Sequence, residues 1–271
     1  MNEILKFIET DGERIFSVEH HPETSDPTKA YIFIHPFAEE KLWSHRVYVT
    51  TARAFCEKNI WVSRFDFRGH GDSEGEFSES SLERHLADID SLVTHVKETC
   101  PNVSSFGLFG LRLGGAIAAL AAASRDDIDE LILWDPVLNG DRYMQDILRS
   151  NLATQMAVKG KVEVTREDLI DKMKSGEPIN IEGYHLTYSY FQELSSIDLF
   201  KHKYPDTLKC CLLQVVRNPK QPINKQYQKF VELFSNEPTL DKAHEEQFWK
   251  EIKTFYNRAD NLLNHSLKWL G

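Results

Sequence analysis

The clearest structural pattern in the sequence is FGLFGLRLGGAIAALAAA, residues 106–123. Phe106 to Phe109 reads as a buried strand, and Leu113 to Ser124 reads as an alanine-rich helix. Between them lies Gly110-Leu111-Arg112-Leu113-Gly114-Gly115, a tight turn whose glycines let the strand and the helix approach closely. A strand that passes through a short turn into a helix is typical of α/β proteins with a mainly parallel sheet.

The same alternation continues on both sides of this stretch. Short apolar runs predict further strands at 31–34, 60–67, 128–134 and 210–216. Helical spacing of apolar residues predicts helices at 43–59, 82–96 and 259–270, and residues 247–252 are expected to form the last strand. The opening segment, 5–23, reads instead as an antiparallel hairpin around Asp11-Gly12.

The alternation of predicted strands and helices stops between residues 139 and 205, where the sequence shows polar helical patterns instead. We therefore expect one α/β domain formed by residues 1–138 and 206–271, with residues 139–205 inserted as a helical cap. A set of aromatic side chains in this insertion could roof an apolar channel or only seat the cap on the core: Tyr184, Tyr188, Tyr190 and Phe191.

Composition excludes several classes of protein. The chain has 271 residues, 41% of them hydrophobic and 27% charged, with a net charge of −10, as in an ordinary globular protein that does not bind nucleic acid. The most apolar run, 114–123, is too short to span a membrane, and the N-terminus lacks the pattern of a secretory signal, so we expect a cytoplasmic protein. The four cysteines have no zinc-ligand spacing, and we expect no metal or cofactor.

Ligands of open α/β sheets bind at the carboxyl ends of the strands, which directs attention to the residues that follow each strand. The turn at 110–114 has the glycine spacing of a G-x-S-x-G elbow, in which a strained residue stands exposed at a helix N-terminus. Here that residue is Arg112, whose guanidinium stays protonated and cannot act as a nucleophile. Most of the acidity lies in 72–90 and 126–135, and each segment places one acid near this turn, Asp72 and Asp135.

The chain resembles the α/β-hydrolases over nearly its whole length. The resemblance rests on HPF at 35–37, DFRGHGDS at 66–73 and the elbow at 110–114. Within this superfamily four stretches look like the second of the two hydrolase-type proteins associated with exosortase A systems: HPFAEEKLWSHR (35–46), GLRLGG (110–115), LWDPVLNGDRY (133–143) and IEGYHLTYSYFQELSSIDL (181–199). That resemblance implies a setting in surface polysaccharide or exosortase-linked export.

The resemblance implies a Ser-His-Asp triad, but the matching positions hold other residues. Arg112 stands at the nucleophile position, and Arg217-Asn218-Pro219 follows the strand after which the family carries its Asp. The segment 253–258 contains no His; His244 precedes the expected last strand and His265 falls inside the closing helix. Serine-hydrolase activity is therefore not expected.

Three hypotheses for function follow. In the first, the elbow pocket binds an anionic or carboxylated ligand, or a partner, without triad chemistry. In the second, Arg112 anchors an oxyanion or carboxylate in an unusual hydrolase or acyl-transfer enzyme, while Asp135, His35 or a water moves the proton. In the third, an internal Arg112–Asp135 bridge closes the pocket and the cap serves protein contacts. The candidate pocket residues are His35, Phe37, Glu39, Glu40, Asp72, Leu111, Arg112 and Asp135.

Overall fold

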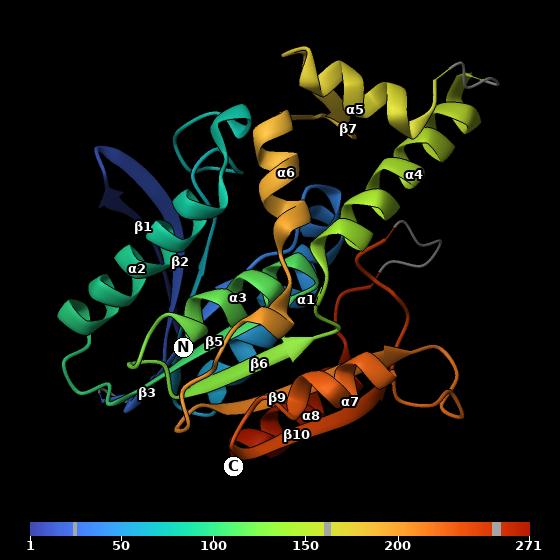
Figure 1. Cartoon of the computed structure of the whole chain (residues 1–271). Helices are drawn as coiled ribbons and strands as arrows, with labels where there is room; N and C mark the ends of the chain where they lie inside the picture. Colours follow the sequence, from blue (N-terminus) through green and yellow to red (C-terminus); the bar gives the residue numbers. More distant parts are fainter. Residues whose placement is uncertain (24–25, 160–163, 251–255) are drawn as a thin grey trace.

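An eight-stranded sheet forms the centre of the computed structural model, which describes residues 1–23, 26–159, 164–250 and 256–271 (Figure 1). Its order is β1-β2-β4-β3-β5-β6-β9-β10. The strands are β1 (Asn2–Thr10), β2 (Glu13–His21), β3 (Lys29–Ile34), β4 (Ile60–Phe65), β5 (Ser105–Leu111), β6 (Glu130–Trp134), β9 (Lys209–Val216) and β10 (Asn236–His244). β1 and β2 pair antiparallel, as does β2 with β4, whereas all pairings from β4 to β10 are parallel.

Helices cover both faces of the sheet. They are α1 (Glu39–Glu57), α2 (Leu82–Thr99), α3 (Leu113–Ala123), α7 (Lys225–Val231) and α8 (Asp260–Leu270), with a short 3-10 helix η1 (Phe77–Glu79) before α2. One core joins α2, α3 and α7 to the sheet face that carries Leu108, and a second core joins α1 and α8 to the face that carries Phe109. Because side chains alternate along a buried parallel strand, β5 supplies both cores.

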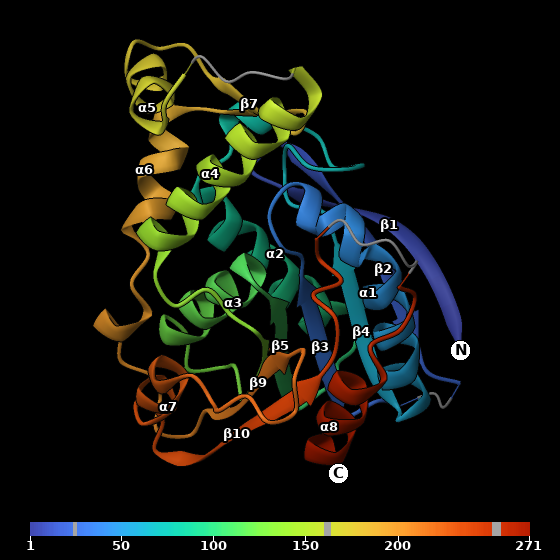
Figure 2. The same cartoon turned by 90° about the vertical axis from the view of Figure 1, so that its right-hand side faces the viewer.

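Between β6 and β9 the chain forms α4 (Gly140–Lys159), α5 (Arg166–Lys174), β7 (Ile179–Ile181), β8 (Tyr184–Leu186), α6 (Tyr188–Ser196) and η2 (Leu199–Lys201). Figure 2 shows α4, α5 and α6 grouped together above α3. Residues 139–205 thus contain helices and a small antiparallel hairpin, β7–β8.

Most of the expected elements are present. The first hairpin turns at Asp11 and Gly12, whose φ angles of 49° and 82° are those of the favoured two-residue hairpin turn. The helix expected at 43–59 begins earlier, at Glu39, because its first turn carries two glutamates rather than apolar residues.

The prediction for the last strand is wrong. Among the described residues the last strand is β10, and residues 247–250 lie in the loop after it. Residues 251–255, including the start of the 253–258 segment, lie outside the described part of the chain. β10 is a polar edge strand, NEPTLDKAH, with a register irregularity between Asn236 and Thr239, so it lacks an apolar pattern. The apolar pair Phe248 and Trp249 is buried from a loop instead. His244 consequently ends the last strand rather than preceding it.

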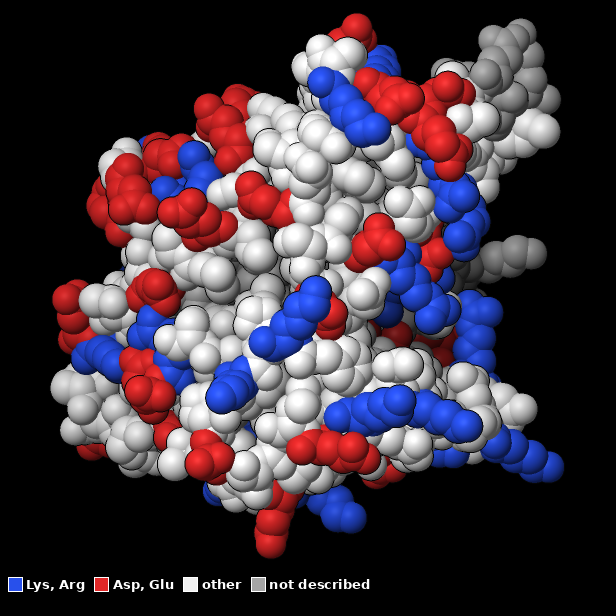
Figure 3. All heavy atoms as spheres, viewed as in Figure 1, with Lys and Arg blue, Asp and Glu red and all other residues white. Residues whose placement is uncertain are grey.

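Acidic side chains gather over the loop that leads into α2, in agreement with the charge expected at 72–90 (Figure 3). Among the described residues, every helix is too short or too polar to cross a membrane.

Candidate functional site

The turn between β5 and α3 holds Arg112 in a strained backbone conformation, with φ 54° and ψ −120°. Its N–H donates to Trp134 O at 3.1 Å, and its carbonyl accepts from Val137 N at 3.1 Å, so neighbouring backbone fixes the turn. A Cβ on Gly110 would lie 2.4 Å from Gly114 O, and one on Gly114 would lie 2.3 Å from Ile34 O. Only glycine fits at both places, and the turn projects the Arg112 side chain away from the sheet.

Two carboxylates contact the Arg112 guanidinium. Nη1 donates to Asp135 Oδ2 and to Asp135 O, both at 3.2 Å, and Nε donates to Glu40 Oε1 at 3.5 Å. The expected Arg112–Asp135 bridge is therefore present, and Glu40 adds a second acid. Among the described residues, Nη2 has no hydrogen-bond acceptor, and about a fifth of the Arg112 side chain (21%) is exposed.

Neighbouring groups fix both acids. Asp135, itself in the left-handed region with φ 44°, accepts Val215 N–H on Oδ1 at 3.3 Å. Glu40 Oε2 accepts the Tyr143 hydroxyl at 2.7 Å. These bonds connect the elbow to β9 through Asp135 and to α4 through Tyr143.

Burial and charge shift the pKa of each group in this cluster. Burial raises the pKa of both Glu40 and Asp135, and the adjacent Arg112 charge opposes that rise. Burial alone would lower the pKa of the Arg112 guanidinium, but the Glu40 and Asp135 carboxylates outweigh it and raise that pKa. The cluster thus contains one fixed cation and two carboxyl groups that are easier to protonate than usual.

Two aromatic rings flank the guanidinium. The Arg112 Cζ lies 5.4 Å from the centre of the Trp249 ring and 5.6 Å from that of the Tyr143 ring, within the range of cation–π contacts. Neither residue was among the candidates from the sequence. Trp249 fell in a segment misread as a strand, and Tyr143 stood in the quoted stretch 133–143 without any signal that α4 would turn it toward Arg112.

A cavity of about 810 Å³ opens above the elbow, between α1, α4 and the β7–β8 hairpin. Of the predicted pocket residues it is lined by Phe37, Glu39, Glu40 and Arg112; Asp135 lies behind Arg112 and contacts it. Other parts of its lining come from Trp43, Tyr143, Asp146, Ile147, Arg149, Ser150, Asn151, Ala153, Thr154, Ile181, Glu182, Trp249, Lys250 and Ala38. Such a volume is in the range of small-molecule sites.

The remaining predicted pocket residues lie outside the lining described for this cavity. His35 is buried; its Nδ1 donates to Pro36 O at 2.8 Å and its Nε2 accepts Phe67 N–H at 3.3 Å. Burial lowers the pKa of His35 well below its usual value, so the ring is neutral and orders the loop.

Leu111 is fully buried in the core, and its N–H donates to the Tyr48 hydroxyl at 3.0 Å. Asp72 is exposed, and its N–H donates to Asp66 Oδ2 at 3.0 Å. In the segment 66–73, Arg68 Nε donates to Asp88 Oδ1 at 2.6 Å and so fixes this loop to α2.

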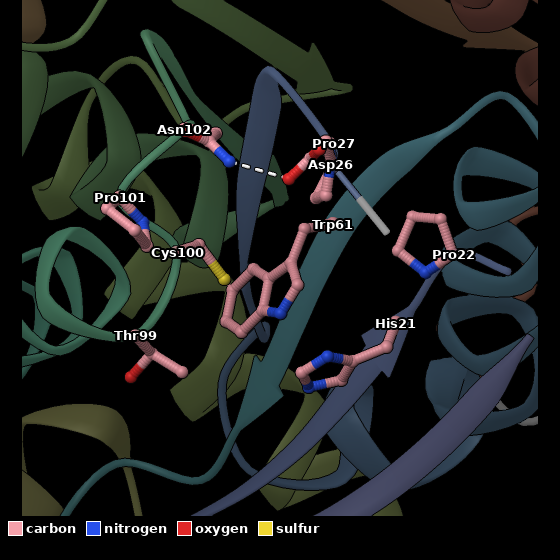
Figure 4. Close-up of a pocket in the computed structure, with 9 residues that line it drawn as sticks. All are labelled: His21, Pro22, Asp26, Pro27, Trp61, Thr99, Cys100, Pro101 and Asn102. Carbon is pink, nitrogen blue, oxygen red and sulfur yellow. Dashed lines mark hydrogen bonds between the residues drawn. The ribbon is translucent and has the colours of Figure 1, made fainter. Parts of the chain in front are cut away.

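A second pocket, of about 370 Å³, lies at the opposite ends of the strands (Figure 4). The buried Trp61 indole forms its floor, with His21 and Cys100 beside it, and Asn102 Nδ2 donates to Asp26 Oδ1 at 2.6 Å across its rim. Because it borders the amino ends of β3, β4 and β5, it is remote from the elbow, and in α/β sheets ligands bind at the carboxyl ends.

The parallel sheet, the strained strand-to-helix turn and the cavity above it define an α/β-hydrolase fold. A family profile described as "Serine aminopeptidase, S33" matches residues 25–185. The chain belongs to this family.

Solved structures give the same fold. Est1E from Butyrivibrio proteoclasticus, solved with ferulic acid bound, is 20% identical with a TM-score of 0.68, and the match covers 98% of this chain and 99% of Est1E. The α/β hydrolase GrgF from Penicillium sp. sh18 is also 20% identical with a TM-score of 0.68, covering 100% of this chain and 98% of GrgF. DcsB, solved with its substrate analogue, is 17% identical with a TM-score of 0.65, covering 99% of both chains. A search of curated proteins finds no match.

Proposed function

We propose that this α/β-hydrolase-like protein lacks the Ser-His-Asp triad and binds an anionic, carboxylated ligand in the elbow cavity. The observation that carries the proposal is the Arg112 guanidinium, which replaces the nucleophile and has no described acceptor for its Nη2 beside an 810 Å³ cavity. The two N–H groups of Nη2 remain available to donate to a ligand carboxylate, while Nε and Nη1 donate to Glu40 and Asp135.

The surroundings of the elbow support the absence of the triad. Asp135 contacts Arg112 and the backbone of Val215, and no histidine ring contacts it among the residues that the structure describes. His244 Nε2 is bonded to Arg217 O at 2.9 Å and its ring is exposed, whereas Trp249, from the loop after β10, covers Arg112. A proton acceptor for a nucleophile is therefore not in place.

The cavity walls favour a carboxylate with an apolar body. Phe37, Trp43 and Trp249 contribute aromatic surface, while α4 brings Arg149 to the rim. Est1E, whose structure contains ferulic acid, suggests ferulate as a first probe, because it combines a carboxylate with an aromatic ring. We further propose that residues 139–205 act as the cap that closes over such a ligand, and that a cytoplasmic setting in exosortase-linked export fits the sequence resemblance.

The proposal is tested by calorimetric titration with ferulate and benzoate. We expect binding to the wild type and a loss of roughly tenfold or more in Arg112→Lys, which keeps the charge but not the Nη2 donors. Arg149→Ala, a change at the exposed rim of the same cavity, serves as the matched control and should change affinity less.

An ester, thioester and amide panel tests the alternative enzymatic hypothesis. We expect no turnover by the wild type. Turnover that disappears in both Arg112→Ala and Asp135→Asn would overturn the proposal in favour of an enzyme that uses Arg112 as an oxyanion or carboxylate anchor. Absence of both binding and turnover would instead favour a scaffold that uses the inserted segment for protein contacts.

A further inference from the structure

We propose that the elbow cavity takes up a monocarboxylate together with one proton, and that Glu40 carries this proton. The inference rests on the proposed function and adds the charge class of the ligand. Its basis is the balance of charge around Arg112, where one guanidinium contacts the carboxyl groups of Glu40 and Asp135.

A third carboxylate on Nη2 would place three negative charges around one positive charge. At a protein surface, water and salt would screen that excess. Here Glu40 and Asp135 are each only 9% exposed, so the repulsion between them and an incoming anion is screened much less. Protonation of one of the two acids returns the site to two negative charges around one positive charge, the balance that it has without a ligand.

Hydrogen bonding identifies Glu40 as the acid that can accept the proton. Both oxygens of Asp135 accept from N–H donors, Val215 N and Arg112 Nη1, so a proton on Asp135 would displace a donor that cannot become an acceptor. The Tyr227 hydroxyl also interacts with Asp135, and it donates to Pro136 O at 3.0 Å. Glu40 Oε2 is bonded instead to the Tyr143 hydroxyl at 2.7 Å. A hydroxyl can rotate and accept, so a protonated Glu40 can donate to Tyr143 Oη without moving.

The other charged and titratable groups around Glu40 do not alter its assignment as the acid that accepts the proton. Burial raises its pKa, and two cations oppose protonation, Arg112 from the elbow and Lys250 from the loop after β10. Both cations are present with or without a ligand, so the charge of the ligand is what changes on binding. The charged and titratable groups that face Glu40 are Glu39 and Tyr48 of α1, Arg112 of the elbow, Tyr143 of α4 and Lys250.

The same balance disfavours a second negative charge beside Arg112. A ligand with two negative charges would need a second proton, and Asp135 offers no oxygen free of N–H donors to hold it. Benzoate and terephthalate make a matched pair of probes, because they share a ring and one carboxylate and differ by the second carboxylate. We expect terephthalate to bind at least about tenfold more weakly than benzoate at pH 7.5.

Calorimetry of benzoate binding in two buffers with different heats of protonation counts the protons taken up. For the wild type we expect uptake of about one proton at pH 7.5 and a Kd that rises by up to about tenfold per pH unit toward pH 8.5. Glu40→Gln removes the titrating group, and its amide can still donate to the Tyr143 hydroxyl. This variant should take up no proton, bind independently of pH and bind more tightly than the wild type at pH 8.5.

Glu39→Gln is the matched control, because Glu39 lines the same cavity and forms no described ion pair with Arg112. It should keep the proton uptake of the wild type. Binding of benzoate without proton uptake, or uptake that persists in Glu40→Gln, overturns this inference and leaves the proposed function intact. Failure of benzoate to bind at every pH overturns both. The proton count of the wild type decides the question even if a variant does not fold.

Discussion

Replacing Arg112 with alanine leaves Glu40 and Asp135 buried beside each other without the guanidinium that both contact. Removing one partner of a buried ion pair costs about 3–5 kcal/mol. We expect the lower end, about 3 kcal/mol, because the contacts are long, at 3.5 and 3.2 Å, and 21% of the Arg112 side chain is exposed. For 271 residues the entropy of unfolding is about 0.57 kcal/mol/K, so this loss lowers Tm by about 5 °C.

The loss should also depend on pH. Burial already raises the pKa of Glu40 and Asp135 above the unfolded values, and without Arg112 both pKa values rise further. An acid whose pKa is raised by folding contributes stability below its unfolded pKa and loses that contribution as the pH rises through the folded pKa. Arg112→Ala should therefore be more destabilising at pH 8 than at pH 5.

Urea unfolding followed by circular dichroism at both pH values measures this effect. The double variant Arg112→Ala/Glu40→Gln should recover part of the lost stability, because one of the uncompensated charges is gone. Arg149→Ala is the control: its exposed pair with Asp146 spans one helical turn, and its removal should change stability by less than about 0.5 kcal/mol. A loss below about 1 kcal/mol for Arg112→Ala, equal at pH 5 and pH 8, would refute the reasoning.

Two further predictions concern the stability of the fold. Gly114→Ala should destabilise by about 3 kcal/mol or more in urea unfolding, because its Cβ would lie 2.3 Å from Ile34 O, and a loss under 1 kcal/mol would contradict that contact. Glu19, buried in β2, has a pKa lowered to about 2: burial works against this, and hydrogen bonds from His95 and His21 outweigh it. The ionised Glu19 stabilises the folded state by roughly 3 kcal/mol above pH 4.5, and this stabilisation is lost as the pH falls toward 2. Glu19→Gln should thus be destabilising at pH 6 but much less so at pH 3, and a difference from wild type that does not change with pH would argue against this pairing.

The sequence predicts the parts of the fold that apolar pattern and turn chemistry dictate. The turn at 110–114, the hairpin at Asp11-Gly12 and the strands on either side of β5 follow from glycine spacing and buried runs. The polar edge strand β10 does not, because its side chains are largely exposed and carry no periodic signal. An apolar pair in the following loop, Phe248 and Trp249, was therefore misread as the strand.

The site was predictable only in part, for a related reason. Arg112 and Asp135 follow directly from strand ends, so their bridge could be expected from topology. The second acid, Glu40, is a candidate from the sequence only because it follows the loop at 35–37. Its contact with Arg112 depends on the start of α1 at Glu39, whereas the sequence predicts that this helix starts at residue 43. Tyr143 and Trp249 reach Arg112 from α4 and from the loop after β10, and no local pattern specifies how such segments dock.

The stacking of Trp249 against Arg112 has an optical consequence. Indole emission responds to the electric field across the ring, and the guanidinium, 5.4 Å from the centre of that ring, is the group on which the proposed ligand would act. A negative charge arriving at Arg112 would alter the field on Trp249, which contacts the guanidinium directly, so this ring is a built-in fluorescent reporter of the cavity. Trp249→Phe would silence that reporter while keeping an aromatic ring over the elbow.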